Sequence, residues 1–226
     1  MSNLLLYLLI ILGIPLSTLL TKYLLKKKLI NANKINQGKG KILYLRSFYR
    51  DGEGTEMSPS LMNPLAFIAK NQGTPHELEL ASALMNLGQL FAIGKPDEQI
   101  PEIGFERLYF SNDLWKEEVL KLMTDSVLIV YRPDSSDNVF WEFEQILNFN
   151  LQPKVIIWNG AFFTFEEPLQ KARYQIFSRK ILTLYNVVLP EYHKSKKFLS
   201  YDENGKWIQT IGIQLTHAYK NVLKTL

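Results

Sequence analysis

The N-terminal part of the chain holds one long run of apolar positions. From Leu4 to Thr21 there are 18 residues without a charged side chain, most of them Leu or Ile. With the extension to Leu25, the run is long enough, at about 1.5 Å per residue, to cross roughly 30 Å of hydrocarbon. We therefore predict a single transmembrane helix over residues 4–25, with the lipid bilayer as its partner.

Two other interpretations of this run are weaker. A cleaved signal peptide begins with basic residues and ends at a small-x-small site, but Met1-Ser2-Asn3 has no basic side chain and no Ala-x-Ala follows the run. A helix buried in a soluble core is rarely apolar on every face. An uncleaved anchor is the interpretation that we favour.

The pattern changes after residue 41. Residues 29–41 are polar and include glycines, which is typical of a tether. Beyond them, short apolar runs alternate with apolar positions at helical spacing. The pattern predicts strands at 42–45, 90–93, 127–131, 155–158 and 181–185, and helices at about 61–69, 77–87, 113–124, 139–149 and 165–179. It also predicts a hairpin of 198–201 with 206–210 and a last helix over 214–226.

Strands that alternate with helices indicate an α/β fold. We expect a mostly parallel five-stranded sheet with helices on both faces. The chain then divides into an anchor with its basic stop (1–28), the tether (29–41) and an α/β domain with a C-terminal hairpin and helix (42–226). Because ligands bind beyond the carboxyl ends of parallel strands, the segments of interest are 46–54, 94–104, 131–144 and the loop after Trp158.

Charge is distributed unevenly along the chain. Nine of the 26 basic residues precede Asp51, the first acidic residue, so residues 51–226 hold 17 basic and 22 acidic side chains. The lysines directly after the apolar run place the α/β domain in the cytoplasm as part of a single-pass membrane protein. The basic residues are concentrated near the membrane, so we expect no nucleic-acid partner. The absence of Cys and the presence of only three His make a metal site improbable.

The first two candidate segments carry residues suited to a phosphate or a ribose. Arg46 and Ser47, after the first strand, offer a guanidinium group and a hydroxyl group. Gly94 permits close approach of a ligand to the backbone, and Pro96 and Pro101 stiffen the loop after the second strand. Each segment has a purely structural alternative: Arg46 paired with a loop acid such as Asp51, and an ordinary loop at 94–104.

The third candidate segment combines a large aromatic ring with carboxyl groups. Trp141 is followed by Glu142, and Glu144 comes two positions later, at the start of the helix after the central strand. The ring could lower the local dielectric constant and raise a carboxyl pKa, or stack on a flat base. Alternatively, Trp141 belongs to the core and the glutamates complement the helix dipole.

Taken together, these motifs give the chain a resemblance to a known family. From about residue 41 to 160 it resembles a Toll/interleukin-1 receptor (TIR) domain of a divergent bacterial group. The residues that carry the resemblance are Arg46-Ser47-Phe48, Glu77, Ala92-Ile93-Gly94 with Pro96, Pro101, Gly104, Arg107 and Tyr109, Trp115 with the helix 119–123, the strand 127–130, and Trp141-Glu142-Phe143.

The resemblance implies a flavodoxin-like sheet and, in many bacterial members, cleavage of NAD⁺ by a glutamate at the start of the third helix. The family places this glutamate about four residues after a Trp and just before an apolar residue, whereas here Glu142 directly follows Trp141 and Glu144 comes three positions after it. The resemblance implies Glu142 as the catalytic residue, because Phe143 follows it and Ile146 comes four positions later, with Glu144 as the alternative. Arg46, Ser47, Gly94, Pro96 and Trp141 would bind the substrate, with NAD⁺ as substrate rather than cofactor. The expected role is a defence or stress effector that self-associates; the alternatives are a non-catalytic signalling adaptor and a nucleotide sensor that binds without cleavage.

Overall fold

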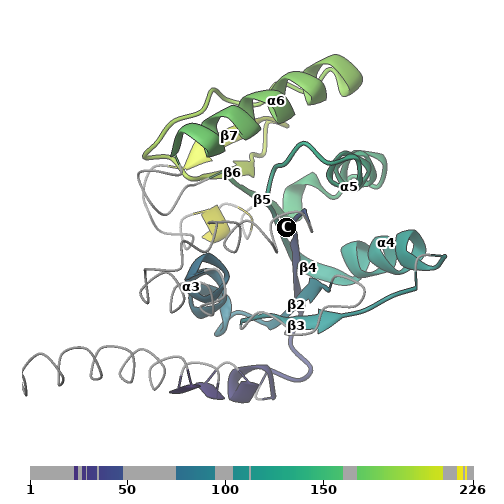
Figure 1. Ribbon diagram of the computed structural model, residues 1–226, viewed down its shortest axis with the longest axis vertical. Coiled ribbons are helices and arrows are strands. Elements are labelled where there is room, and N and C mark those ends of the chain that lie inside the picture. The colour runs from purple at the N-terminus through teal and green to yellow at the C-terminus, as the bar shows by residue number, and fades with distance from the viewer. Residues whose placement is uncertain are drawn as a thin grey trace, which may run out of the picture.

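The computed structural model describes residues 23–24, 27–28, 30–34, 36–47, 75–94, 104–111, 113–159, 167–210, 218–220 and 222 of the 226-residue chain (Figure 1). Within this part of the chain, no helix is both long and apolar enough to cross a membrane. The predicted span over residues 4–25 lies outside the described residues except for Tyr23 and Leu24. The predicted helix at about 61–69 also lies outside them.

The centre of the molecule is a mostly parallel seven-stranded sheet. Its strands are β1 (Lys41–Leu45), β2 (Gln89–Ile93), β3 (Glu106–Leu108), β4 (Ser126–Tyr131), β5 (Val155–Trp158), β6 (Phe198–Tyr201) and β7 (Trp207–Thr210). The order across the sheet is β3-β2-β1-β4-β5-β6-β7. The first five strands in this order are parallel, and β6 and β7 are added as an antiparallel hairpin.

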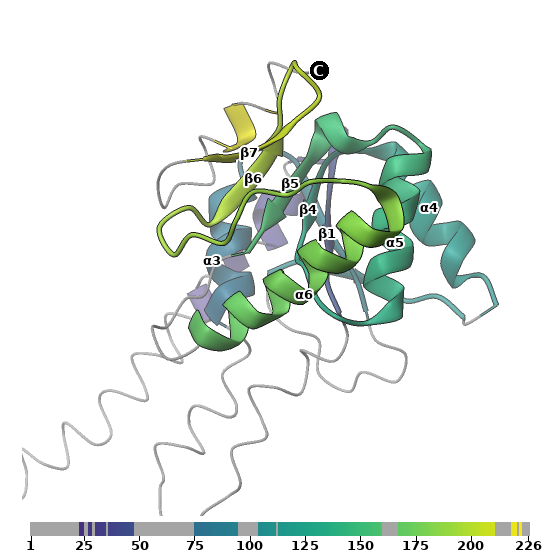
Figure 2. The same ribbon diagram turned by 90° about the horizontal axis from the view of Figure 1, so that it is seen from above.

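Helices cover both faces of the sheet, as the pattern predicted. Helices α4 (Trp115–Asp125), α5 (Asp137–Asn148) and α6 (Glu167–Tyr185) pack on one face, and α3 (Pro75–Leu84) packs on the other with the helical positions Ala218 and Val222. A short 3-10 turn, η2 (Gln152–Lys154), leads into β5. Figure 2 shows α5 and α6 next to each other on their face.

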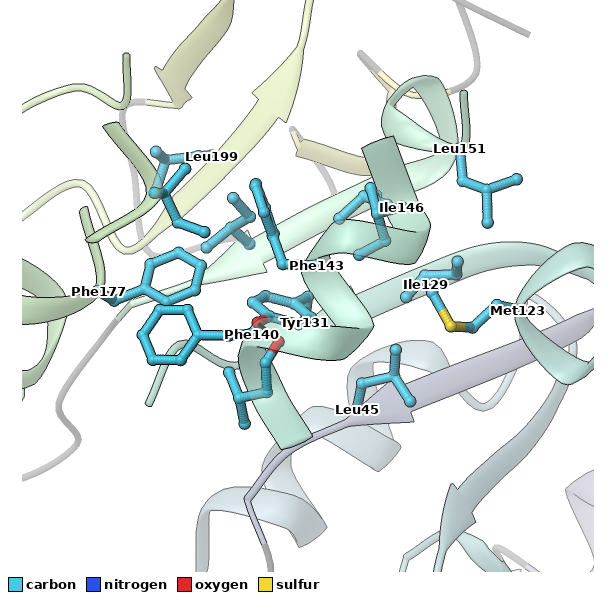
Figure 3. Packing of buried hydrophobic residues seen from close by; sticks show 14 of the residues in the cluster. Leu45, Met123, Ile129, Tyr131, Phe140, Phe143, Ile146, Leu151, Phe177 and Leu199 are labelled. Atoms are coloured by element: carbon cyan, nitrogen blue, oxygen red, sulfur yellow. Dashed lines mark hydrogen bonds between the residues drawn. The ribbon is translucent and has the colours of Figure 1, made fainter. Parts of the chain in front are cut away.

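Alternation along the strands divides the core into two layers. In β1, Ile42 and Tyr44 belong to the layer under α3, whereas Leu43 and Leu45 belong to the layer under α4, α5 and α6. β4 follows the same alternation, because successive side chains of a strand point to opposite faces. Figure 3 shows the second layer, in which Phe140, Phe143 and Phe177 gather beside Tyr131.

Two features of the sheet differ from the prediction. The segment Ile181–Tyr185, predicted as the fifth strand, is the last part of α6, and the helix predicted to end at residue 179 continues to Tyr185. The fifth parallel strand is instead β3, a three-residue edge strand that pairs with β2 and that the apolar pattern did not indicate. The sheet therefore has seven strands rather than five. The predicted hairpin is confirmed, and it supplies the other two strands.

The start of the domain is held by two asparagines. Ile30 to Lys34 are helical, and Asn33 exchanges two hydrogen bonds with the backbone of Leu90, at 3.1 and 3.3 Å. Buried Asn36 donates from its amide nitrogen to the carbonyl oxygens of Met85 and Gly88, at 2.6 and 3.0 Å. This part of the predicted tether is therefore packed against the domain.

Candidate functional site

The sheet has one point at which the strand order reverses. The chain passes from β1 outward to β2 and β3, and then returns to the other side of β1 as β4. In open α/β sheets, ligands bind in the crevice beyond the carboxyl ends of the two strands that flank such a reversal. The residues in this position are Arg46 and Ser47 after β1, and the segment from Arg132 to Asp134 after β4.

The charged side chains at this carboxyl edge are unusually buried. Arg46, Arg132 and Asp134 are only 8%, 6% and 6% exposed, and Ser47 is also buried. The backbone N–H of Arg132 donates to the Leu45 carbonyl oxygen at 2.9 Å, which extends the pairing of the two strands by one residue. Arginine and aspartate are rarely buried in this way without a structural or binding role.

Arg132 is anchored by an aromatic ring. Its guanidinium carbon lies 3.9 Å from the centre of the Trp158 ring at the end of β5, a close cation–π contact. Asp134 accepts a 2.6 Å hydrogen bond from the Ser135 backbone N–H. A positive and a negative group, two positions apart in the chain, thus lie at the carboxyl edge of the sheet.

The N-terminus of α5 faces the same edge, because α5 follows directly on β4. Ser136 occupies its N-cap position with an extended backbone but forms no side-chain capping bond. Within the described part of the chain, the buried Ser136 hydroxyl has no hydrogen-bond partner. The N–H groups in the first turn of a helix favour an anion such as a phosphate.

Glu142 is the most unusual group near this edge. It lies in the second turn of α5 and is 4% exposed, and its Oε2 atom has no hydrogen-bond partner among the described residues. Burial raises the pKa of Glu142 to about 8. Its carboxyl group is therefore mostly protonated at neutral pH.

Tyr131, the last residue of β4, is bonded to α5 and lies within reach of the charge of Glu142. Its hydroxyl donates a 2.6 Å hydrogen bond to the Val139 carbonyl oxygen on α5. Burial raises the pKa of Tyr131, and the nearby carboxylates of Glu142 and Asp134 raise it further. Glu142 and Asp134 are thus both close enough to Tyr131 to raise the pKa of its hydroxyl group.

The two other candidates on α5 point elsewhere. Trp141 is half-buried, and its ring packs against Trp115 of α4 with 5.1 Å between centroids. Burial raises the pKa of Tyr185, and the Glu144 carboxylate raises it further, which places Glu144 near the C-terminal end of α6. Trp141 therefore packs toward α4, and Glu144 is half-buried near Tyr185 of α6, whereas Glu142 is buried.

Gly94 has a packing reason for being glycine. A Cβ atom at this position would meet the Tyr109 ring at 2.3 to 2.8 Å, closer than real side chains approach. The backbone N–H of Gly94 also donates to the Leu108 carbonyl oxygen at 2.9 Å. Close approach of Tyr109 accounts for Gly94 without a ligand. Pro96 and the rest of the loop up to residue 103 lie outside the described residues.

Arg132, Asp134 and Tyr131 were not singled out by the sequence, although the segment that begins at Tyr131 was. The signal was available in Tyr131-Arg132-Pro133-Asp134, where two charged residues directly follow an apolar strand. Among the described residues, no three His, Cys, Asp or Glu side chains group so as to hold a metal ion.

No protein-family model, curated protein or solved structure matches the chain. By its fold and site, the described part of the chain is an α/β protein with buried arginines at the carboxyl edge of a mostly parallel sheet and a buried carboxyl group on the adjoining helix.

Proposed function

We propose that the chain is a membrane-anchored TIR-like protein that binds NAD⁺ at the carboxyl edge of β1 and β4 and cleaves its N-glycosidic bond. The sheet supports this proposal. When the short edge strand β3 is set aside, the order β2-β1-β4-β5 corresponds to the first four strands of a flavodoxin-like sheet, 2-1-3-4. A role in bacterial defence or stress, which the resemblance implies, is part of the same proposal.

The observation that carries the proposal is Glu142. A buried carboxyl group with an oxygen atom that lacks a hydrogen-bond partner lowers stability, so a protein retains one at a position where it serves another purpose. Its pKa of about 8 is set by burial, and it lies in the second turn of α5, the helix that follows the strand end with Arg132 and Asp134. This combination of burial, perturbed pKa and position is typical of a catalytic acid or base.

The chemistry required is limited. The bond between ribose and nicotinamide breaks, the electron pair leaves with the nicotinamide, and the ribose develops the charge of an oxocarbenium ion. The Glu142 carboxylate would stabilise that charge until water adds and a proton is released. Because the positive charge of bound nicotinamide favours the ionised carboxyl group, substrate binding would lower the pKa of Glu142.

The described residues at the strand ends would hold the rest of the substrate. Arg46 and Arg132 suit the pyrophosphate, since guanidinium groups form charge-assisted bonds with phosphate oxygens. The uncapped N-terminus of α5 would add backbone N–H groups. Ser47 would donate to a ribose hydroxyl group.

The test uses the full chain at high density in liposomes, with NAD⁺ added and nicotinamide release followed by chromatography. We expect release by the wild type, a loss of at least about 100-fold in E142Q and near-wild-type rates in E144Q, the matched change on the other side of α5. Equal rates in wild type and E142Q would contradict the assignment of Glu142. Absence of release from the wild type would contradict cleavage.

A second candidate function is nucleotide binding without cleavage. The 4% exposure of Glu142 favours it, because a catalytic carboxylate must reach the ribose, whereas the arginines at the strand ends serve binding alone. In this case calorimetry would detect NAD⁺ binding that R132Q weakens and E142Q leaves unchanged, with no nicotinamide released. Binding lost in E142Q would argue against this second candidate.

A further inference from the structure

A cavity lies at the opposite edge of the sheet from the candidate site. Its volume is about 550 Å³, and its lining includes Lys27, Lys28, Asn31, Lys39, Met85 and Asn86. The turn after α3 that forms one wall leads directly into β2, so the cavity is at the amino ends of the parallel strands. Arg46 and Arg132 follow the carboxyl ends. The cavity is therefore separate from the site proposed for NAD⁺.

The walls of this cavity are fixed to each other. One wall is the segment around Asn31 to Lys39, and the other is the turn at Met85 and Asn86. Asn36 joins the two through its bonds to Met85 and Gly88, and it is 2% exposed. Asn33 adds its paired bonds to Leu90. Side-chain hydrogen bonds, buried at Asn36 and partly buried at Asn33, thus hold the two walls together at this point.

The charge of the cavity has one sign. Three of its described lining residues are lysines and none is acidic. Two other lysines of this edge form contacts of their own, since Lys41 pairs with Asp125 at 3.4 Å and Lys154 donates to the carbonyl oxygens of Thr124 and Ser126 at 2.8 Å. Three ammonium groups with asparagine amides around one hollow match the donors that bind a phosphate group.

We propose that this cavity binds the phosphate of an anionic phospholipid headgroup. Lys27 and Lys28 come two and three positions after residue 25, where the predicted membrane span ends, so that span would place them near the headgroup phosphates. Leu24 and Met85 give the cavity apolar surface for the adjoining glycerol and acyl carbons. A bound headgroup would fix the domain at the membrane with its carboxyl edge pointing away from the bilayer.

The test is calorimetric titration of the full chain in neutral-detergent micelles. The probes are dihexanoyl phosphatidylglycerol, dihexanoyl phosphatidylcholine and inorganic phosphate. We expect saturable binding of the phosphatidylglycerol and loss of affinity on the order of 100-fold in K27Q/K28Q/K39Q, because each lysine contributes roughly fivefold to binding of an anionic headgroup. The matched control K171Q/K194Q/K206Q removes three exposed lysines elsewhere and should change affinity by less than about threefold.

A second variant distinguishes binding of the headgroup inside the cavity from general attraction of an anion to the lysines. N86W fills the cavity from an exposed position and keeps every lysine, whereas N148W adds the same ring on α5. We expect N86W alone to weaken binding, with thermal unfolding of both variants unchanged. Equal losses of affinity in the two triple-lysine variants, or wild-type affinity in N86W, would contradict binding in the cavity. If inorganic phosphate bound as tightly as phosphatidylglycerol, the proposal that the ligand is a phospholipid would be contradicted.

Discussion

At the residue scale, Glu142 is the group whose chemistry most departs from its ordinary behaviour. Its carboxyl group is ionised in an unfolded chain at neutral pH, but burial keeps it mostly protonated in the folded protein. The folded state therefore binds one proton more than the unfolded state between the two pKa values. Stability must fall as pH rises through this window.

E142Q should remove this dependence. In the wild type, the free energy of unfolding is expected to decrease by about 1.4 kcal/mol per pH unit from roughly pH 4.5 to about 8 and then level off. Glutamine keeps the size of the side chain but does not ionise. The variant should therefore exceed the wild type in stability by about 3 kcal/mol at neutral pH and match it near pH 4.5. Urea unfolding at several pH values measures the difference.

E144Q is the control for this prediction. It removes a carboxyl group from the same helix at a half-buried position, and it should keep the wild-type slope. If E142Q retained the wild-type pH dependence, the carboxyl group of Glu142 would not be the buried titrating group.

The same titration should govern catalysis. If the Glu142 carboxylate stabilises the oxocarbenium ion, only the ionised form of the free protein is active. We expect kcat/KM for NAD⁺ to rise about tenfold per pH unit up to about pH 8 and then to level off. Initial rates of nicotinamide release at low NAD⁺ concentration measure it. A profile that falls over this range would contradict a carboxylate role.

At the element scale, the end of α6 shows how tertiary packing selects a structure. Ile181 to Tyr185 is a run of apolar, β-branched and aromatic residues, which by itself favours a strand. The buried positions Gln170, Tyr174, Phe177 and Ile181 recur at helical spacing, whereas Leu182 and Leu184 are exposed. One continuous helical stripe against the core therefore decides the conformation.

Alanine substitutions should distinguish these two roles. I181A removes a fully buried side chain and should lower the free energy of unfolding by about 2–5 kcal/mol. L182A changes a side chain that is 47% exposed and should change it by less than about 0.5 kcal/mol. Chemical denaturation of both variants measures this. A larger effect of L182A than of I181A would indicate that the segment packs through the other face, as a strand would allow.

At the scale of the whole molecule, the segment that holds Asn33 and Asn36 joins the predicted anchor to the α/β domain. The bonds of Asn33 and Asn36 attach the residues after the predicted anchor to the start of β2. This segment is therefore attached to the domain at the amino edge of the sheet, and the proposed nucleotide site lies at the carboxyl edge. Under the proposed membrane anchoring, this arrangement would keep the proposed site accessible and concentrate neighbouring domains in the plane of the bilayer.

Asn36→Ala should loosen this attachment. The substitution leaves the buried carbonyl oxygens of Met85 and Gly88 without their donor, which costs about 1–3 kcal/mol. Hydrogen exchange at residues 36–40 should accelerate by at least about tenfold relative to the wild type. N31A, an exposed asparagine on the same segment, is the control and should not change exchange. Unchanged exchange in N36A would show that other contacts hold the segment.

The sequence by itself determined the class of fold, because strands buried on both faces and amphipathic helices leave strong periodic signals. It predicted β1, β2, β4 and β5 and the hairpin of β6 with β7. It also led to Arg46, Ser47 and Glu142 as candidates. A three-residue edge strand such as β3 is too short for a periodic pattern, so the sequence did not indicate it.

Only the tertiary structure decided which candidates share a neighbourhood. It joined Glu142 with Tyr131 and Asp134, turned Glu144 toward α6, and gave Gly94 a packing role beside Tyr109. It also placed Lys27, Lys28 and Lys39 around one cavity. Periodicity reports which face of an element is buried, but burial against a particular neighbour depends on contacts between segments far apart in the chain. Those contacts set the pKa of Glu142, and they determine where a ligand could bind.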